Sequence, residues 1–157
     1  NWINEELAPA ITEKFSDVQI LIISSGEVPL HAHPIVTFTG FVSNLYEYIY
    51  ASDFCIAPVR LQNGISTKVI DSMACAKLVV VLPSVVNGTP ELVDGQNAII
   101  ARDESEFISR TLEILGKPEE ANRMGINARK VIEEHYNWEV LAEEWRQLVK
   151  KIMSESS

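Results

Sequence analysis

The stretch from Pro58 to Pro83 carries the residues of this 157-residue chain best suited to binding a ligand. An apolar run ends in a polar loop with Gly64, and the loop leads directly into a helical pattern with Lys68 and Asp71. Side chains three residues apart share one face of a helix, so this cation and this carboxylate can line one cleft. The pairing suits the phosphate and hydroxyl groups of a sugar nucleotide. The alternative is an ordinary solvated ion pair.

The beginning of the same helix is suited to a diphosphate. The first turn of a helix presents backbone N–H groups without intrahelical partners, and the helix dipole makes this end positive. Ser66 and Thr67 fall in the first turn of a helix expected over 65–76, where their hydroxyls can donate further hydrogen bonds. The sequence therefore predicts an anion site at the start of this helix.

Strands and helices alternate along the chain and must position this segment. Aliphatic runs bounded by glycine, proline or polar residues predict buried strands at 18–24, 35–39, 54–59, 78–82 and 97–101. Helical patterns occupy 2–14, 45–51, 65–76, 89–93, 104–115, 119–135 and 138–153. This alternation implies right-handed crossovers and an α/β fold with a doubly wound parallel sheet. Ligands bind such sheets beyond the carboxyl ends of the strands.

Composition limits the classes of function. The length allows one domain with a sizeable core. The net charge is −9 at pH 7. A nucleic-acid-binding surface needs a basic stripe, so we expect no nucleic-acid partner. No apolar run approaches the roughly 20 residues of a membrane-spanning helix. Cys55 and Cys75 lie in an expected strand and at a helix end, which favours two reduced core residues, with a disulfide as the alternative.

The central segment also resembles the signature of family-4-like retaining glycosyltransferases, also described as glycosyl transferases group 1. One branch of that family reads Arg-x-Gly-x-Gly-Thr-Arg-x-Lys-x-x-Glu-Ala-Met-Ala. The residues that match in register, with Asp for Glu, are Arg60, Gly64, Lys68, Asp71, Met73 and Ala74. The likeness extends over about 18–150, through the strand-Gly-Val pattern at 36–42, the Gly-x-Pro-Glu stretch at 87–97 and Tyr-Asn-Trp at 136–138.

The resemblance implies a fold and an extent for the domain. Residues 1–153 would form the Rossmann-like, donor-binding C-terminal half of a GT-B glycosyltransferase, without its usual first strand and with helices at the C-terminus. Residues 154–157 would be a frayed tail. The family's catalytic histidine and acceptor site lie on an N-terminal Rossmann-like domain, which we expect as the missing partner. We therefore expect the isolated chain to be inactive and to bind nucleotide weakly.

The resemblance also assigns roles to individual residues. Asp71 would bind the ribose hydroxyls, and Gly40 would begin the loop that approaches the base. Lys68 would hold the diphosphate together with the first-turn residues Ile65, Ser66 and Thr67. Asn63 stands where the family has the Glu that contacts the donor sugar, and its amide carries no charge. The predicted catalytic residues are Lys68 and Asn63.

Further donor-binding residues follow from the same resemblance. They are Gly64, Arg60, Gly88 and Glu91. A side chain at Gly88 would block the donor cleft. For Glu91 an alternative remains open, because an acidic residue also suits the first turn of a helix.

The implied reaction is transfer of a glycosyl group from a nucleoside-diphosphate sugar to a hydroxyl with anomeric retention. Amides and Lys68 can stabilise the departing diphosphate, so we expect neither a metal nor a cofactor. The resemblance implies a hexosyltransferase-type enzyme of glycoconjugate biosynthesis in the cytoplasm, with any contact to the inner membrane face made by the missing domain. Two alternatives remain: a non-catalytic binding or regulatory module of the same fold, and a sugar-nucleotide epimerase on a GT-B scaffold.

Overall fold

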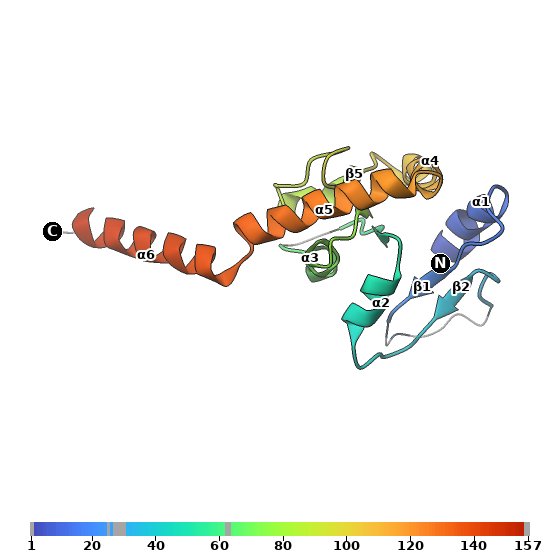
Figure 1. Ribbon diagram of the computed structural model, residues 1–157, viewed down its shortest axis with the longest axis horizontal. Coiled ribbons are helices and arrows are strands. Elements are labelled where there is room, and N and C mark those ends of the chain that lie inside the picture. The colour runs from blue at the N-terminus through green and yellow to red at the C-terminus, as the bar shows by residue number, and fades with distance from the viewer. Residues whose placement is uncertain (1, 25, 27–30, 62–63, 156–157) are drawn as a thin grey trace.

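The computed structural model describes residues 2–24, 26, 31–61 and 64–155. Its helices include a π-helical turn at Ile3–Leu7 and a 3₁₀ segment at Pro83–Gly88; the α-helices are α1 (Ala8–Thr12), α2 (Leu45–Ala51), α3 (Thr67–Ala74), α4 (Glu104–Leu115), α5 (Pro118–His135) and α6 (Trp138–Glu155). The strands are β1 (Ile20–Ile22), β2 (Val36–Phe38), β3 (Cys55–Ala57), β4 (Val79–Val81) and β5 (Ile99–Ile100). The alternating order is the expected α/β order (Figure 1).

The strands form two sheets, and every strand pair is parallel. Their orders are β2-β1 and β3-β4-β5, with Ile20 opposite Val36 and Cys55 opposite Val79. A doubly wound sheet of order 3-2-1-4-5-6 splits into these two groups when its central first strand is left out. Within the residues described, no strand joins β1 to β3.

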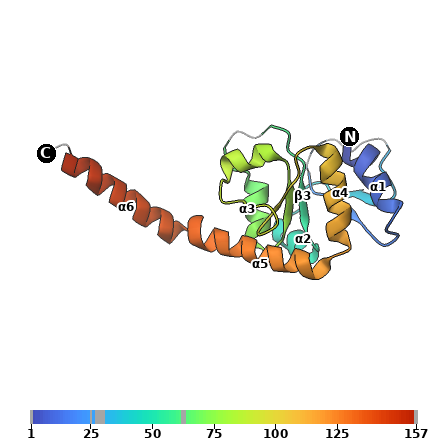
Figure 2. The same cartoon turned by 90° about the horizontal axis from the view of Figure 1, so that it is seen from above.

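Helices cover both faces of the strands, so the β4 side chains are buried on each side. Val80 belongs to a cluster with Leu7 of the N-terminal helical turn and Phe107 of α4. Val79 and Val81 belong to a second cluster with side chains from α3 and α5. Figure 2 shows α1 and α4 on one side of the strands and α3 on the other. Burial of each such aliphatic side chain contributes about 1.5–3 kcal/mol. The expected α/β fold, with helices on both faces of parallel strands, is therefore confirmed.

Local hydrogen bonds fix where the helices begin. The Asn44 side chain accepts from the Tyr46 amide at the start of α2, and the Asp103 side chain accepts from the Glu106 amide at the start of α4. Pro118 occupies the first turn of α5, where a missing N–H costs nothing. These caps match the sequence expectation for the two long helices α4 and α5 to within one residue.

Three predicted boundaries are wrong. The short helix expected at 89–93 is absent, and helical structure lies earlier, in the 3₁₀ segment. The Asn97 side chain accepts from the Val93 amide and donates to the Glu91 carbonyl, so side-chain bonds replace a helix ladder there. The helix expected at 65–76 is shorter and begins at Thr67. The last helix, expected to end at 153, continues through Glu155, and residues 156–157 lie outside the described residues, so the frayed tail stays a prediction.

Two further expectations concern chemistry across the chain. Cys55 and Cys75 are both free, Cys55 half-buried and Cys75 buried, and burial raises the pKa of the Cys75 thiol. None of the helices in the described residues combines the length and the apolar character needed to cross a bilayer.

Candidate functional site

The N-terminus of α3 lies beyond the carboxyl end of β3, where a parallel sheet binds its ligands. Gly64 enters it with a φ of +78°, a left-handed conformation that favours glycine. Ile65 and Ser66 precede the helix in extended conformation or coil, and Thr67 is its first residue. Ile65 is 56% exposed, and Thr67 is also exposed. The chain thus presents the beginning of a helix to solvent at this edge.

Ser66 is the N-cap of α3, but its side chain does not cap the helix. The residue is 3% exposed, and its Oγ has no hydrogen-bond partner among the described residues. A buried hydroxyl without a partner is costly, and serine at this position ordinarily accepts from a first-turn amide. The described residues therefore do not use the hydrogen-bonding capacity of this hydroxyl, and the first amides of α3 have no intrahelical acceptors.

Lys68 and Asp71 lie on α3 next to this end. The Lys68 side chain is exposed, and Asp71 is half-buried one turn further along. The hydroxyl of Tyr46 on α2 donates to Asp71 Oδ1 at 3.3 Å. The negative charge of Asp71 raises the pKa of Tyr46. An exposed cation and a hydrogen-bonded carboxylate therefore lie in the first turns of α3.

Gly88 lies directly against the loop that enters α3. A Cβ atom built on it would lie 2.0 Å from the Gly64 carbonyl oxygen and 3.1 Å from the Ile65 amide nitrogen. Backbone at these positions cannot move without shifting the loop. The 3₁₀ segment ends at Gly88 and therefore packs through its main chain against the loop that leads into α3.

Glu91 is bound within the protein. Its carboxylate accepts a hydrogen bond of 2.5 Å from the Tyr136 hydroxyl, which comes from the junction of α5 and α6. Burial and this bond raise the pKa of Tyr136 to about 12. The neighbouring Thr89 is fully buried. The Glu91 carboxylate thus fastens the turn after Gly88 to the end of α5.

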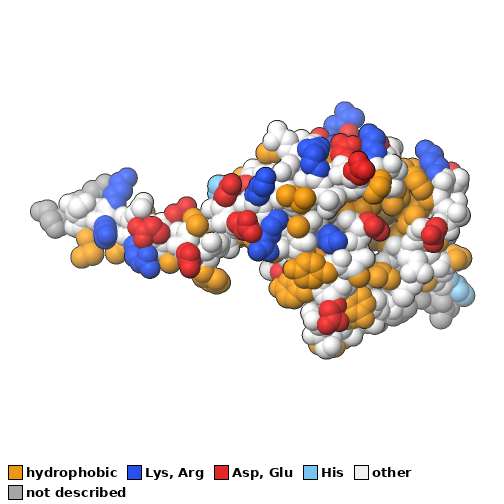
Figure 3. Space-filling model, in the orientation of Figure 1, with side chains coloured by type: hydrophobic (Ala, Val, Ile, Leu, Met, Phe, Trp, Pro, Cys, Tyr) orange, Lys and Arg blue, Asp and Glu red, His pale blue; other side chains and the backbone are white. Residues whose placement is uncertain are grey.

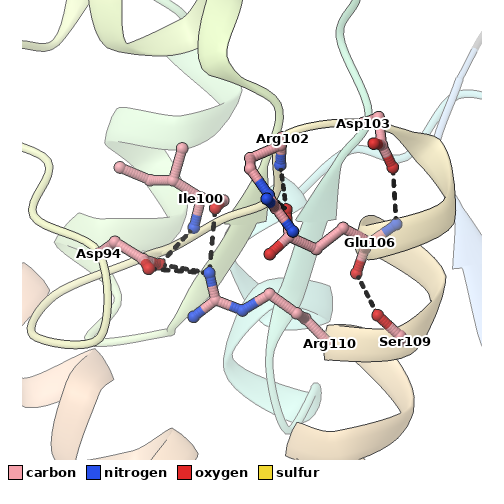
Figure 4. Close-up of polar contacts among 7 residues, drawn as sticks. All are labelled: Asp94, Ile100, Arg102, Asp103, Glu106, Ser109 and Arg110. Carbon is pink, nitrogen blue, oxygen red and sulfur yellow. Dashed lines mark hydrogen bonds and ion pairs between the residues drawn. The ribbon is translucent and has the colours of Figure 1, made fainter.

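The following loop is held by Asp94 and Arg110 (Figure 4). Arg110 Nη1 donates to both Asp94 carboxylate oxygens, at 2.7 and 2.8 Å, and to the Ile100 carbonyl. Asp94 Oδ1 also accepts from the Ile100 amide. Burial raises the pKa of Asp94, but the Arg110 hydrogen bond and charge outweigh it and lower the pKa overall. This clamp joins the loop after Glu91 to α4 and to β5.

Arg60 is directed elsewhere. It forms an ion pair with Glu104 at the start of α4. Both residues line an open pocket of about 470 Å³, together with Leu82, Pro83, Ser84, Arg102, Asp103 and Ser105. Arg60 is therefore bound to the start of α4, whereas Lys68 and Asp71 lie on α3.

Two predicted residues remain, Gly40 and Asn63. Gly40 lies in a loop two residues after the end of β2 with a φ of +70°, and Phe41 beside it is 84% exposed. Asn63, the predicted sugar contact, lies outside the described residues. Among the described residues, no group of three histidine, cysteine, aspartate or glutamate side chains could hold a metal ion. The roles predicted for these residues stay predictions.

Comparison with known proteins decides the family. The profile of the family described as "Glycosyl transferases group 1" matches residues 1–117. The chain belongs to this family. The match covers most of the chain, including β1 to β5 and the whole α3 segment.

The relatives of this group 1 glycosyltransferase chain are longer. It is 29% identical over 124 residues to an uncharacterized glycosyltransferase of Methanocaldococcus jannaschii, a match to 76% of this chain and 31% of the relative. It resembles sucrose-phosphate synthase from Thermosynechococcus elongatus with a TM-score of 0.70 and 17% identity, over 94% of this chain and 49% of that one. It also resembles Anabaena Alr3699/HepE in complex with UDP, with a TM-score of 0.74 and 15% identity, over 98% of this chain and 46% of the HepE chain. The chain thus spans less than half of each.

These likenesses confirm the expected fold, the Rossmann-like C-terminal half of a GT-B glycosyltransferase. Two side-chain contacts of the candidate site were not predicted from the sequence. Tyr46 contacts Asp71 across 25 residues, and Tyr136 contacts Glu91 across 45. Helical periodicity describes neighbours three or four residues apart, so it carries no signal for either contact.

Proposed function

We propose that the chain supplies the donor-binding half of a retaining glycosyltransferase and binds a nucleoside-diphosphate sugar at the N-terminus of α3. The observation that carries the proposal is the buried, unpartnered Ser66 hydroxyl at a helix start, with exposed Lys68 beside it. Such an end attracts a polyanion through its amides and dipole. Ser66, Thr67 and the backbone at Ile65 would donate to the phosphate oxygens.

The proposed chemistry is electrostatic. The bond between the anomeric carbon and the diphosphate oxygen breaks, and an acceptor hydroxyl forms the new bond with loss of its proton. Negative charge grows on the departing diphosphate, where Lys68 and the α3 amides would stabilise it. Because these groups supply positive charge, the proposal includes no metal or cofactor. Asn63 would contact the sugar through its amide.

Asp71 would accept hydrogen bonds from the ribose hydroxyls. It is held by the Tyr46 hydroxyl, which leaves the second carboxylate oxygen for the nucleotide. The loop from Gly40 would approach the base. Gly88 and Glu91 would act indirectly: Gly88 by its close contact with Gly64, and Glu91 by fixing the turn that follows. Arg60 would contribute only if a donor displaced its ion pair with Glu104.

The relatives support the proposal. HepE was solved in complex with UDP-glucose. Over 98% of its own length, this chain resembles that structure with a TM-score of 0.72 and 17% identity. Only 46% of the HepE chain is matched, so a second domain would provide the acceptor site and the catalytic histidine. We further propose that the complete enzyme is a cytoplasmic hexosyltransferase, and that this second domain makes any contact with the membrane.

Titration of the 157-residue chain with UDP, GDP and ADP, followed by backbone amide resonances, tests the site. We expect weak binding and chemical-shift changes concentrated at residues 64–71 and around Gly40. Changes confined to the pocket between Arg60 and Glu104, or none at millimolar nucleotide, would refute the α3 site. In the presence of a separately supplied acceptor-binding domain, sugar transfer supports the proposal, whereas binding without turnover would indicate a regulatory module and donor isomerisation an epimerase.

A further inference from the structure

Side chains of α2 reach the α3 segment in two places. The Tyr46 hydroxyl donates to Asp71 Oδ1 at 3.3 Å, and one turn later in each segment the Tyr50 hydroxyl interacts with the Cys75 thiol. Tyr46 is 48% exposed and Tyr50 is 60% exposed. Figure 3 shows orange side chains, the class that includes tyrosine, at the surface over α2. Tyr46 therefore presents its hydroxyl to solvent directly beside the carboxylate that we propose binds the ribose.

The direction of the hydrogen bond between Tyr46 and Asp71 follows from the chemistry of the two groups. An ionised carboxylate only accepts hydrogen bonds, so the single phenolic proton points to Asp71. The negative charge of Asp71 and this bond raise the pKa of Tyr46, so the hydroxyl keeps its proton at neutral pH. The Tyr46 oxygen then offers a ligand only its lone pairs, as does the second oxygen of Asp71. The pair therefore presents two neighbouring acceptors on two different residues.

Two neighbouring acceptors restrict the chemistry of their ligand. A phosphate group at neutral pH is an anion with acceptor oxygens, so the carboxylate of this pair repels it. A neutral vicinal diol carries two adjacent O–H donors, and each donor can find one of the two acceptors. The ribose of a nucleotide offers such a diol, and the diol is lost when either hydroxyl is absent. The pair of Tyr46 and Asp71 is therefore suited to a ribose with both hydroxyls.

We propose that Tyr46 is a ribose-binding residue that selects ribonucleotides over deoxyribonucleotides. One ribose hydroxyl donates to Asp71, and the adjacent hydroxyl donates to the Tyr46 oxygen. This inference rests on the proposed donor site at α3. A site that binds a substrate hydroxyl discriminates against the analogue that lacks it, because a polar group of the protein is then left without its partner. Water can replace the missing hydroxyl at these accessible groups, so the discrimination is about three- to tenfold for each hydroxyl.

Hydrogen bonds at the start of α2 hold Tyr46 in place. The Tyr46 amide donates to the Asn44 side chain at 3.2 Å, and the Asn44 side chain donates to Glu47 Oε1 at 2.8 Å. Gly40 lies shortly before this cap, so the loop that we propose approaches the base leads directly to Tyr46. The segment 40–46 would therefore contact both parts of the nucleoside, the base through its loop and the ribose through its helix.

Titrations of the 157-residue chain with UDP, 2′-deoxy-UDP and 3′-deoxy-UDP, followed by backbone amide resonances, test the proposal. The unmodified chain should bind each deoxy analogue about three- to tenfold more weakly than UDP. Tyr46→Phe should weaken UDP binding by a similar factor but leave the binding of one analogue nearly unchanged, because that analogue lacks the hydroxyl that Tyr46 accepts. Asp71→Asn should show its smallest effect with the other analogue. Tyr50→Phe is the matched control, since it removes the same hydroxyl one turn further along α2, and it should leave all three affinities unchanged.

Three results would overturn the role of Tyr46. Equal losses for UDP and both analogues in Tyr46→Phe would show that the hydroxyl contacts neither ribose hydroxyl. If one and the same analogue were least affected by both Tyr46→Phe and Asp71→Asn, Tyr46 would act only through Asp71. If the unmodified chain bound UDP and both analogues equally, with resonance changes still at 64–71, the inference would fail and the donor site would stand. An absence of resonance changes at 64–71 would remove the donor site and the inference together.

Discussion

Gly88 and Gly64 meet backbone to backbone: a Cβ built on Gly88 would lie 2.0 Å from the Gly64 carbonyl oxygen. Gly64 itself has a φ of +78°, so its carbonyl is fixed by a turn that other residues adopt at a cost. The two glycines therefore fix how closely the loop before α3 packs against the 3₁₀ segment. Any side chain at residue 88 must displace the loop that we propose binds the diphosphate.

Gly88→Ala should weaken UDP binding roughly tenfold, equivalent to about 1.4 kcal/mol, and should lower the free energy of unfolding by about 1–3 kcal/mol through overpacking. An amide-resonance titration with UDP measures the first effect, and chemical denaturation measures the second. Gly116→Ala is the matched control, since its added Cβ would lie an ordinary 3.5 Å from the nearest atom, the Glu113 carbonyl oxygen. Equal UDP affinity in the Gly88→Ala and unmodified chains would count against a donor site at Gly64.

Asp71→Ala should abolish UDP binding and leave the fold intact, because Asp71 is only half-buried and its side-chain bond is to exposed Tyr46. Loss of the ribose contact removes a charge-assisted hydrogen bond, which contributes about 1.5–3 kcal/mol. Titration with UDP and with uridine measures the loss, which we expect for both ligands since each carries the ribose. Tyr46→Phe serves as the milder comparison and should weaken binding less. Undiminished UDP affinity in Asp71→Ala would remove Asp71 from the site.

Lys68→Ala should separate the phosphate contacts from those of the nucleoside. Lys68 is exposed in the first turn of α3, and in the proposed site its ammonium would contact phosphate oxygens and not the ribose. If Lys68 contacts the diphosphate as proposed, binding of UDP and UDP-glucose should fall roughly tenfold, about 1.4 kcal/mol, and binding of uridine should change little. Comparative titrations with these three ligands measure the difference. Equal losses for uridine and UDP would show that Lys68 does not contact phosphate.

The order of the elements was predictable because burial leaves a strong pattern in the sequence. The run Val79–Val81 is apolar at every position because α4 and α3 cover its two faces, and the periodicity of α4 follows its buried side, Phe107 and Ile114. The short helix at 89–93 was predicted wrongly because Asn97 takes the backbone hydrogen bonds of that turn. No propensity scale contains such a bond between a side chain and a distant backbone group.

The site was predictable only along α3. Spacing alone places Lys68 and Asp71 near one helix end, and the structure keeps both there. The partners of Asp71 and Glu91 depend on how α2 and α5 pack, because Tyr46 and Tyr136 come from 25 and 45 residues away. The contact between Gly88 and Gly64 also depends on tertiary packing, because it requires the 3₁₀ segment to pack against the loop before α3.

Tyr136→Phe should lower the free energy of unfolding near neutral pH by about 1–2 kcal/mol, because it removes a hydrogen bond to a carboxylate. The folded-state pKa of Tyr136 is raised from 10.0 to about 12. A raised pKa means that the folded chain holds this proton more tightly than the unfolded chain. The stabilisation is therefore complete below pH 10 and is lost as the pH rises to about 12.

Denaturation curves between pH 9 and 12, about the range set by this pKa shift, measure the difference. The unmodified chain should lose stability more steeply than Tyr136→Phe. Glu91→Gln keeps an acceptor but removes the charge, so it should lower the pKa of Tyr136 seen by ultraviolet absorbance. Tyr50→Phe, at an exposed position, is the control. Parallel pH profiles for the unmodified and Tyr136→Phe chains would contradict the proposed bond to Glu91.

Ala76→Gly should stabilise the chain. Ala76 follows the end of α3 with a φ of +57°, a left-handed conformation that costs an alanine about 1–2 kcal/mol and glycine almost nothing. Its conformation is fixed by the packing of α5, because a Cβ on Gly125 would lie 2.1 Å from the Ala76 carbonyl oxygen. After the greater freedom of glycine in the unfolded chain is subtracted, we expect a gain of about 0.5–1 kcal/mol by chemical denaturation. Ala51→Gly, at the last residue of α2, should have the opposite sign, and a loss of stability in Ala76→Gly would show that the left-handed turn is not strained.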